Sequence, residues 1–150
     1  MKRWYFAYGM NTNIREMARR CPGAVCYGPV VLPEHKFVFR LHADVEECPG
    51  HHVEGVLWEL TPACEQALDM LEGYPHYYFK KQVVVESTQP KLDGMTKFVA
   101  MVYYMNRQEG TEHPGSMYLS CLNEGYADNG LNHYQIEQAL AECERNEKAS

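Results

Sequence analysis

A glutamate at the end of an expected helix is the first residue whose type and position could do chemistry. Glu72 lies in the sequence LDMLEG, residues 68–73. A carboxylate in the last turn of a helix faces the partial negative charge of unpaired carbonyls, and burial among the aromatic residues that follow would add desolvation. Both effects raise a carboxyl pKa toward neutrality, where proton transfer is efficient. Glu72 is therefore a candidate general acid/base; the alternative is a solvated carboxylate at a helix end.

A glycine turn near the start of the chain is the second candidate feature. A strand pattern over residues 4–8 runs into Gly9 and then into the start of a helix at Asn13. Successive backbone N–H groups in such a junction can converge on one point and bind an anion, such as a small carboxylate. A purely structural turn uses the same residue types, so this feature alone leaves both interpretations open.

Capping signals predict four helices around these features. Asn13 with Glu16 forms a capping box, and Thr61 before a proline is a typical N-cap. The expected helices run from Asn13 to about Arg20, from Thr61 to Gly73, from about Ser116 to Ala127 with a stop at Gly130, and from about Asn132 to Arg145.

The remaining segments predict a sheet. Six stretches are rich in β-branched and aromatic residues and are separated by turn formers. Several of them alternate polar and apolar residues, as half-buried antiparallel strands do. We expect an α+β fold with a small, mostly antiparallel β-barrel of about six strands and flanking helices. The expected strands are residues 4–8, 25–32, 36–41, 53–60, 78–87 and 97–105.

Composition and charge limit the class of protein. The chain has 150 residues, 45% hydrophobic and 12% aromatic, which is typical of one folded domain, expected over residues 1–150. A net charge of −6 repels phosphate backbones, so we expect no nucleic-acid partner. The longest apolar stretch, Phe98 to Met105, is far shorter than the ~20 residues of a membrane span. We expect no membrane association, a cytoplasmic location, and a monomer or homodimer.

The six cysteines do not indicate disulfides or a metal. Nothing else in the sequence is typical of a secreted protein, so we expect free thiols, mostly buried. No C-x-x-C pair occurs, which removes the commonest zinc signature. The segment from Cys48 to His52 is the one cluster with spacing near that of metal ligands, and its Pro-Gly centre favours a surface hairpin tip. Neither a metal nor a nucleophile elbow is expected.

Four segments in order resemble the gamma-glutamylcyclotransferase family. Residues 5–11 are similar to the family's Y-F-A-Y-G-S-N, and residues 55–58 to its G-V-V/L-W strand. Residues 68–73 resemble its L-D-x-x-E-G, and the stretch from Tyr118 to Tyr134 resembles its Y…(E/D)-N-G-L-x-x-x-Y segment. Together the segments span nearly the whole chain.

The resemblance implies a fold, a reaction and a set of site residues. It implies a small β-barrel with a cavity at its mouth, and conversion of a γ-glutamyl amide into 5-oxoproline with release of the amine or amino acid. No metal or cofactor is needed for that ring closure. By match of motif, Glu72 would be the general acid/base. The residues that would bind the substrate are Tyr5, Tyr8, Gly9, Met10, Asn11, Tyr78 and Tyr118, although Tyr78 and Tyr118 could instead be core rings.

One residue departs from the family pattern. Met10 stands where the family has serine, which removes a hydroxyl but keeps the backbone N–H. Because anion-binding turns act through the main chain, we expect Met10 to reshape the pocket rather than abolish activity. The alternative is a noncatalytic protein of the same fold that senses or sequesters a γ-glutamyl or amino-acid ligand. The leaving group stays open among amino acids, amines and the remainder of glutathione.

Overall fold

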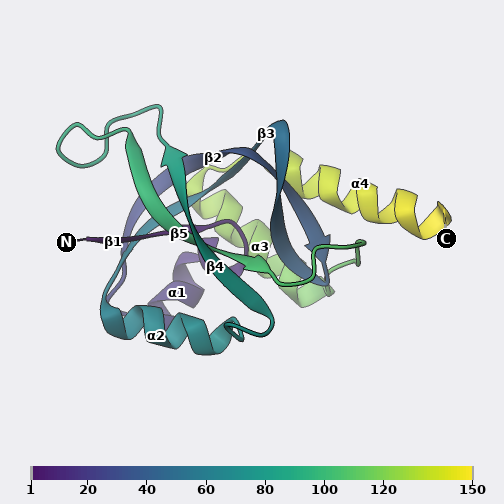
Figure 1. Ribbon diagram of the computed structural model, residues 1–150, viewed down its shortest axis with the longest axis horizontal. Helices are drawn as coiled ribbons and strands as arrows, with labels where there is room; N and C mark the ends of the chain where they lie inside the picture. Colours follow the sequence, from purple (N-terminus) through teal and green to yellow (C-terminus); the bar gives the residue numbers. More distant parts are fainter. Residues whose placement is uncertain (1, 150) are drawn as a thin grey trace.

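Five strands close into a barrel in the computed structural model, which describes residues 2–149 (Figure 1). Their order around the barrel is β1-β3-β2-β4-β5, and every neighbouring pair is antiparallel except β1 with β5. This confirms the expected α+β fold with a mostly antiparallel barrel. The strands are β1 (Arg3–Ala7), β2 (Val25–Arg40), β3 (His42–Leu60), β4 (Tyr78–Glu86) and β5 (Lys97–Met105).

The described chain has five strands rather than about six because a bulge replaces an expected turn. The sequence predicted a break between residues 32 and 36, but β2 is continuous there. Its register against β3 shifts between Pro33 and His35, and Glu34 adopts a φ of 59°. Such a bulge bends a strand without ending it. On the partner strand, the segment from Cys48 to His52 was expected as a hairpin tip but forms a bulge within β3. The hairpin between β2 and β3 turns at Leu41 instead.

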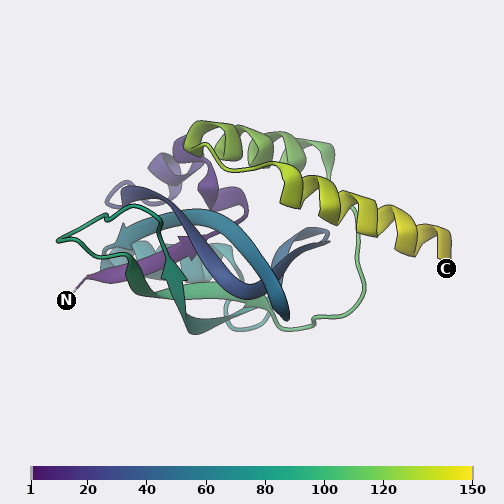
Figure 2. The same cartoon turned by 90° about the horizontal axis from the view of Figure 1, so that it is seen from above.

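Four helices flank the barrel, as expected. They are α1 (Ile14–Arg20), α2 (Pro62–Leu71), α3 (Ser116–Asn129) and α4 (Tyr134–Ala149). Figure 2 shows α1, α3 and α4 on one side of the barrel, whereas α2 lies along its lower end in Figure 1. Within residues 2–149, none of the helices is long and apolar enough to span a membrane.

The predicted caps set where the first two helices begin. The Asn13 side chain accepts a hydrogen bond from the Glu16 N–H at 3.0 Å, and Thr61 Oγ1 accepts one from the Cys64 N–H at 3.1 Å. Each cap satisfies an N–H that has no partner within the helix. The start of α1 is therefore held one short turn after β1, and α2 begins directly after β3.

Candidate functional site

A cavity of about 330 Å³ opens where β1 ends and the chain turns toward α1. All eight residues proposed from the sequence line it, although they come from distant parts of the chain. Gly9 allows the turn to pass close to β3, because a Cβ there would lie 3.2 Å from both Ala43 Cβ and the Tyr118 hydroxyl. The proposed residues on the cavity wall are Tyr5, Tyr8, Gly9, Met10, Asn11, Glu72, Tyr78 and Tyr118.

The end of α2 holds the backbone of Glu72. Gly73 follows it with a φ of 66°, a left-handed conformation that glycine adopts without steric cost. The Gly73 N–H donates to the Met70 carbonyl at 3.2 Å and the Tyr74 N–H to the Asp69 carbonyl at 2.9 Å. This pair of bonds is the Schellman arrangement of a helix C-terminus. The helix therefore stops at Glu72, whose side chain lines the cavity.

Burial changes the acidity of Glu72. Removal from bulk water raises the pKa of its carboxyl to about 7, while the positive charge of Arg20 and a hydrogen bond from Asn11 act in the opposite direction. At neutral pH the carboxyl is therefore present in both its protonated and ionised forms, as a group that both accepts and returns a proton must be. The sequence predicted this direction from the helix end and the neighbouring aromatic residues.

Asn11 connects Glu72 to the rest of the cavity. Its side-chain nitrogen donates to Glu72 Oε1 at 3.3 Å and to the Tyr5 hydroxyl at 3.0 Å. Its side-chain oxygen accepts from Arg20 Nη1 at 2.9 Å, and its backbone carbonyl accepts from Trp58 Nε1 at 3.0 Å. Because the guanidinium can only donate, Arg20 fixes the orientation of the Asn11 amide. Asn11 thus holds one oxygen of Glu72.

The cavity tyrosines have distinct hydrogen-bonding roles. The Tyr8 hydroxyl donates to the Tyr103 carbonyl and the Tyr78 hydroxyl to the Ala43 carbonyl, each at 2.7 Å. The Tyr118 hydroxyl accepts from the Ala43 N–H at 3.0 Å. Burial raises the pKa of all these tyrosines, so their hydroxyls stay protonated at neutral pH. Among the described residues Tyr118 has no acceptor for its own proton, which leaves it as a donor toward the cavity.

Sequence reasoning missed several residues of the cavity wall. Arg20 was expected only as the end of the first helix, and His42 lay beside an expected strand end without any pattern to distinguish it. In the structure His42 Nδ1 lies 2.8 Å from the Tyr77 hydroxyl, and burial lowers the pKa of His42. The wall residues that no sequence signal indicated are Arg20, His42, Ala43, Leu71 and Tyr103, whereas Tyr77 is one of the aromatic residues expected to follow Glu72.

None of the six cysteines lines the cavity. All six cysteines are free, as expected, but only Cys21, Cys64 and Cys143 are buried. Cys48 Sγ lies 3.2 Å from His51 Nδ1 in the bulge of β3. Within residues 2–149, the one group of three potential ligand side chains brought together is on the surface near the end of α4: His113, Glu144 and Glu147.

Comparisons with known proteins show the family and the fold of the chain. Residues 5–120 match the family model described as "Gamma-glutamyl cyclotransferase, AIG2-like". A gamma-glutamylcyclotransferase of Bos taurus is 30% identical over 139 residues, which cover 85% of this chain and 71% of the bovine protein. A solved gamma-glutamyl cyclotransferase has a TM-score of 0.77 at 24% identity and covers 91% of this chain and 86% of its own. An uncharacterized protein from Homo sapiens has a TM-score of 0.77 at 25% identity, with 91% and 85% covered.

Proposed function

The chain belongs to the gamma-glutamyl cyclotransferase, AIG2-like family, and we propose that it converts a γ-glutamyl amide into 5-oxoproline with release of the amine or amino acid. The observation that carries this proposal is the environment of Glu72. Its carboxyl lines a cavity, has a pKa raised to about 7, and is held through one oxygen by Asn11. The second oxygen is then the atom that exchanges a proton with the substrate.

The reaction closes a five-membered ring within the substrate. The α-amine of the glutamyl group attacks its own γ-carbonyl carbon, so nucleophile and electrophile are already tethered and the enzyme chiefly folds the chain and moves protons. An α-amine in a peptide-like setting has a pKa of about 8 and is mostly protonated at neutral pH. The ammonium must lose two protons to become the ring N–H: one passes to water before the attack, and Glu72 takes the other as the new C–N bond forms. When the original C–N bond breaks, the protonated Glu72 gives that proton to the leaving amine.

The turn after β1 supplies the groups that hold the glutamyl end. The N–H groups of Thr12 and Asn13 already bond back to the carbonyls of Gly9 and Met10, each at 3.0 Å. The turn's N–H donors for the substrate carboxylate or the developing oxyanion are therefore those of its cavity-lining part, residues 9–11. Aligned donors of this kind contribute about 10²–10³ in rate each in acyl-transfer sites.

A direct assay tests the proposal. Purified protein is incubated with γ-glutamyl-alanine, γ-glutamyl-propylamine and glutathione, and 5-oxoproline is quantified by mass spectrometry. We expect 5-oxoproline from at least one of the three substrates. Its absence with all three would reject the cyclotransferase assignment.

The competing function is ligand binding without turnover. Met10 favours it, since the hydroxyl of the family serine is missing from the turn. The position of Glu72 argues against it, because a binding protein gains nothing from a carboxyl held in an unfavourable helical position. Calorimetric binding of a γ-glutamyl compound without formation of 5-oxoproline would identify the binding protein.

The pH dependence of the reaction is a further expected result. Since Glu72 must be ionised to accept the proton of the attacking amine, kcat/KM is expected to fall below a pKa of about 7. The guanidinium of Arg20 lowers the Glu72 pKa, so Arg20→Gln should move this transition to higher pH. Initial rates between pH 5 and pH 9 in buffers of constant ionic strength measure the transition in the wild type and its shift in Arg20→Gln. A transition that stays in place in the variant would mean that another group controls it.

A further inference from the structure

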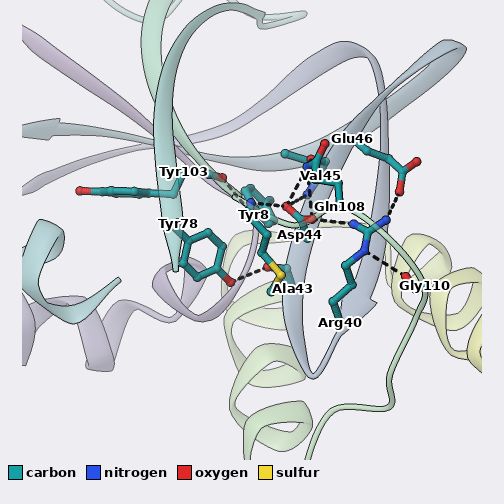
Figure 3. A network of polar contacts seen from close by, with 11 residues as sticks. Tyr8, Arg40, Ala43, Asp44, Val45, Glu46, Tyr78, Tyr103, Gln108 and Gly110 are labelled. Atoms are coloured by element: carbon teal, nitrogen blue, oxygen red, sulfur yellow. Dashed lines mark hydrogen bonds and ion pairs between the residues drawn. The ribbon is translucent and has the colours of Figure 1, made fainter. Parts of the chain in front are cut away.

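A buried carboxylate lies just outside the cavity wall. Asp44 is completely buried near the start of β3. Its Oδ1 accepts from the backbone N–H groups of Val45 and Met105, each at 2.9 Å. Its Oδ2 accepts from Arg40 Nη1 at 2.5 Å and from Gln108 Nε2 at 3.2 Å (Figure 3). A carboxylate with this many donors is isolated from water and fully engaged by the protein.

This carboxylate joins two strands that no backbone ladder joins. In the parallel pairing of β1 with β5, Tyr5 lies opposite Met101, so β1 stops at Ala7 before it reaches Met105. Among the described strands β3 and β5 are not paired with each other. The Met105 N–H, left without a strand partner on this side, bonds to Asp44. The early end of β1, which opens the cavity, thus creates the gap that Asp44 spans.

The backbone of Ala43, the residue before Asp44, is hydrogen-bonded to two of the tyrosine hydroxyls of the cavity. The Ala43 carbonyl accepts from the Tyr78 hydroxyl, and the Ala43 N–H donates to the Tyr118 hydroxyl. In an antiparallel pair the N–H and C=O of one residue face the same side, so both bonds of Ala43 depend on the position of the same short backbone segment. That segment is fixed on its C-terminal side by the bond from the Val45 N–H to Asp44.

We propose that Asp44 is a positioning residue for the cavity, because its carboxylate fixes the β3 segment from which Ala43 holds the Tyr78 and Tyr118 hydroxyls. It touches no substrate itself and acts through Ala43. The kinetic test of this role rests on the proposed cyclotransferase function. Glu72 is held separately, by Asn11 and by the end of α2. Loss of Asp44 should therefore weaken substrate binding more than it slows the chemical step.

The test substitutes Asp44→Asn, which keeps the side-chain shape but replaces one acceptor by a donor. A buried N–H or the Arg40 guanidinium then loses its partner, and this displaces the segment. We expect KM for the best γ-glutamyl substrate to rise by about tenfold while kcat changes by less than about threefold, as an interaction made equally in the ground and transition states predicts. An unchanged KM in the folded variant would overturn the proposal.

Glu46→Gln is the matched control. Glu46 is two residues further along β3 and binds the same guanidinium, with its Oε1 2.6 Å from Arg40 Nη2. Within residues 2–149, its side chain makes no hydrogen bond to the Ala43–Val45 backbone. Its substitution should leave both KM and kcat unchanged. An equal rise in KM for Glu46→Gln would mean that the ion pair as a whole, and not the Asp44 bonds to the backbone, is responsible.

Adding Asp44→Asn to a double variant separates a positioning role of Asp44 from an effect on overall stability. In a Tyr78→Phe/Tyr118→Phe background the two hydroxyls are gone, so adding Asp44→Asn should not raise KM further, although it should still lower the unfolding temperature. A further tenfold rise in KM in that background would contradict the proposal.

Two further experiments apply if Asp44→Asn does not fold or if the wild type has no activity. If Asp44→Asn does not fold, Gln108→Met removes a milder set of bonds, those from Gln108 Nε2 to Asp44 and to the Val45 carbonyl. It should raise KM by about threefold, and no change would count against the role. If the wild type forms no 5-oxoproline, the proposed function fails, and a solved structure of the Asp44 or Gln108 variant decides the positioning role. A retained bond between Ala43 and Tyr118 would then reject it.

Discussion

Glu72→Gln is expected to lower kcat for 5-oxoproline formation by about 10³-fold, within the range for loss of a general acid/base. The amide keeps the length of the side chain and an oxygen that can accept from Asn11. It cannot take the proton of the substrate ammonium or return it to the leaving amine. Because binding groups are untouched, KM should stay within a few-fold of the wild-type value. Steady-state kinetics on the best substrate of the panel measure both constants.

The same substitution should stabilise the protein at alkaline pH. Burial raises the pKa of Glu72 to about 7 in the folded state, above its unfolded value, so the folded state holds the proton more tightly. Its contribution to stability is present below the unfolded pKa and is lost as the pH rises through 7. Solvent in the open cavity reduces the stability effect of this pKa shift. With that reduction, Glu72→Gln should raise the free energy of unfolding at pH 8 by about 1–2 kcal/mol and change it little at pH 5.

A surface carboxylate provides the comparison for Glu72. Glu86→Gln alters an exposed residue on β4 that lies 3.8 Å from Lys97 and outside the cavity. It should change neither kcat nor the pH dependence of urea unfolding. If Glu72→Gln keeps wild-type turnover, the proton-transfer role of Glu72 is wrong even where the reaction itself is observed.

Gly125→Ala is expected to lower both stability and activity. A Cβ at this position would lie 2.5 Å from Thr12 Oγ1 and 2.7 Å from the Asn13 backbone nitrogen, so α3 and the turn after β1 must move apart. Overpacking of this kind costs about 1–3 kcal/mol. In a domain of this size each kcal/mol lowers the melting temperature by about 2–4 °C.

Gly125→Ala should also lower activity, because the turn that it displaces belongs to the cavity. The displaced turn includes Asn11, whose side chain holds Glu72, so kcat/KM should fall by about tenfold, equivalent to about 1.4 kcal/mol of transition-state stabilisation. Gly115→Ala is the matched control, since nothing lies within 4 Å of a Cβ built there. It should change the melting temperature and kcat/KM little. Equal effects of the two substitutions would show that α3 is sensitive to any added methyl group.

Local signals in the sequence predicted those helix starts and ends that depend on a single segment of the chain. Asn13 and Thr61 satisfy the first N–H groups of their own helices, so both helix starts were predictable without a partner segment. The position of Gly73 likewise predicted the end of α2, where Glu72 is the C-cap residue directly after the last turn. The resemblance to a known family supplied the cavity tyrosines, which composition and spacing alone did not indicate.

Long-range pairing decided what the sequence left open. The number of strands depended on whether residues 33–35 turn or bulge, and that depends on the register against a partner strand that begins after Leu41. A bulge and a turn use similar residues, so only the pairing distinguishes them.

The chain by itself therefore determined the starts of α1 and α2, the end of α2, the class of fold and the candidate acidic residue, because neighbours within a few positions set each of them. The fourth helix, expected from about Asn132 to Arg145, instead runs from Tyr134 to Ala149. Only the tertiary structure placed Arg20 against Asn11 and Asp44 between β3 and β5. A buried charge is stable only where the folded chain brings it several partners, and those partners lie far away in the sequence. The raised pKa of Glu72 likewise depends on burial, which the distant segments around the cavity supply.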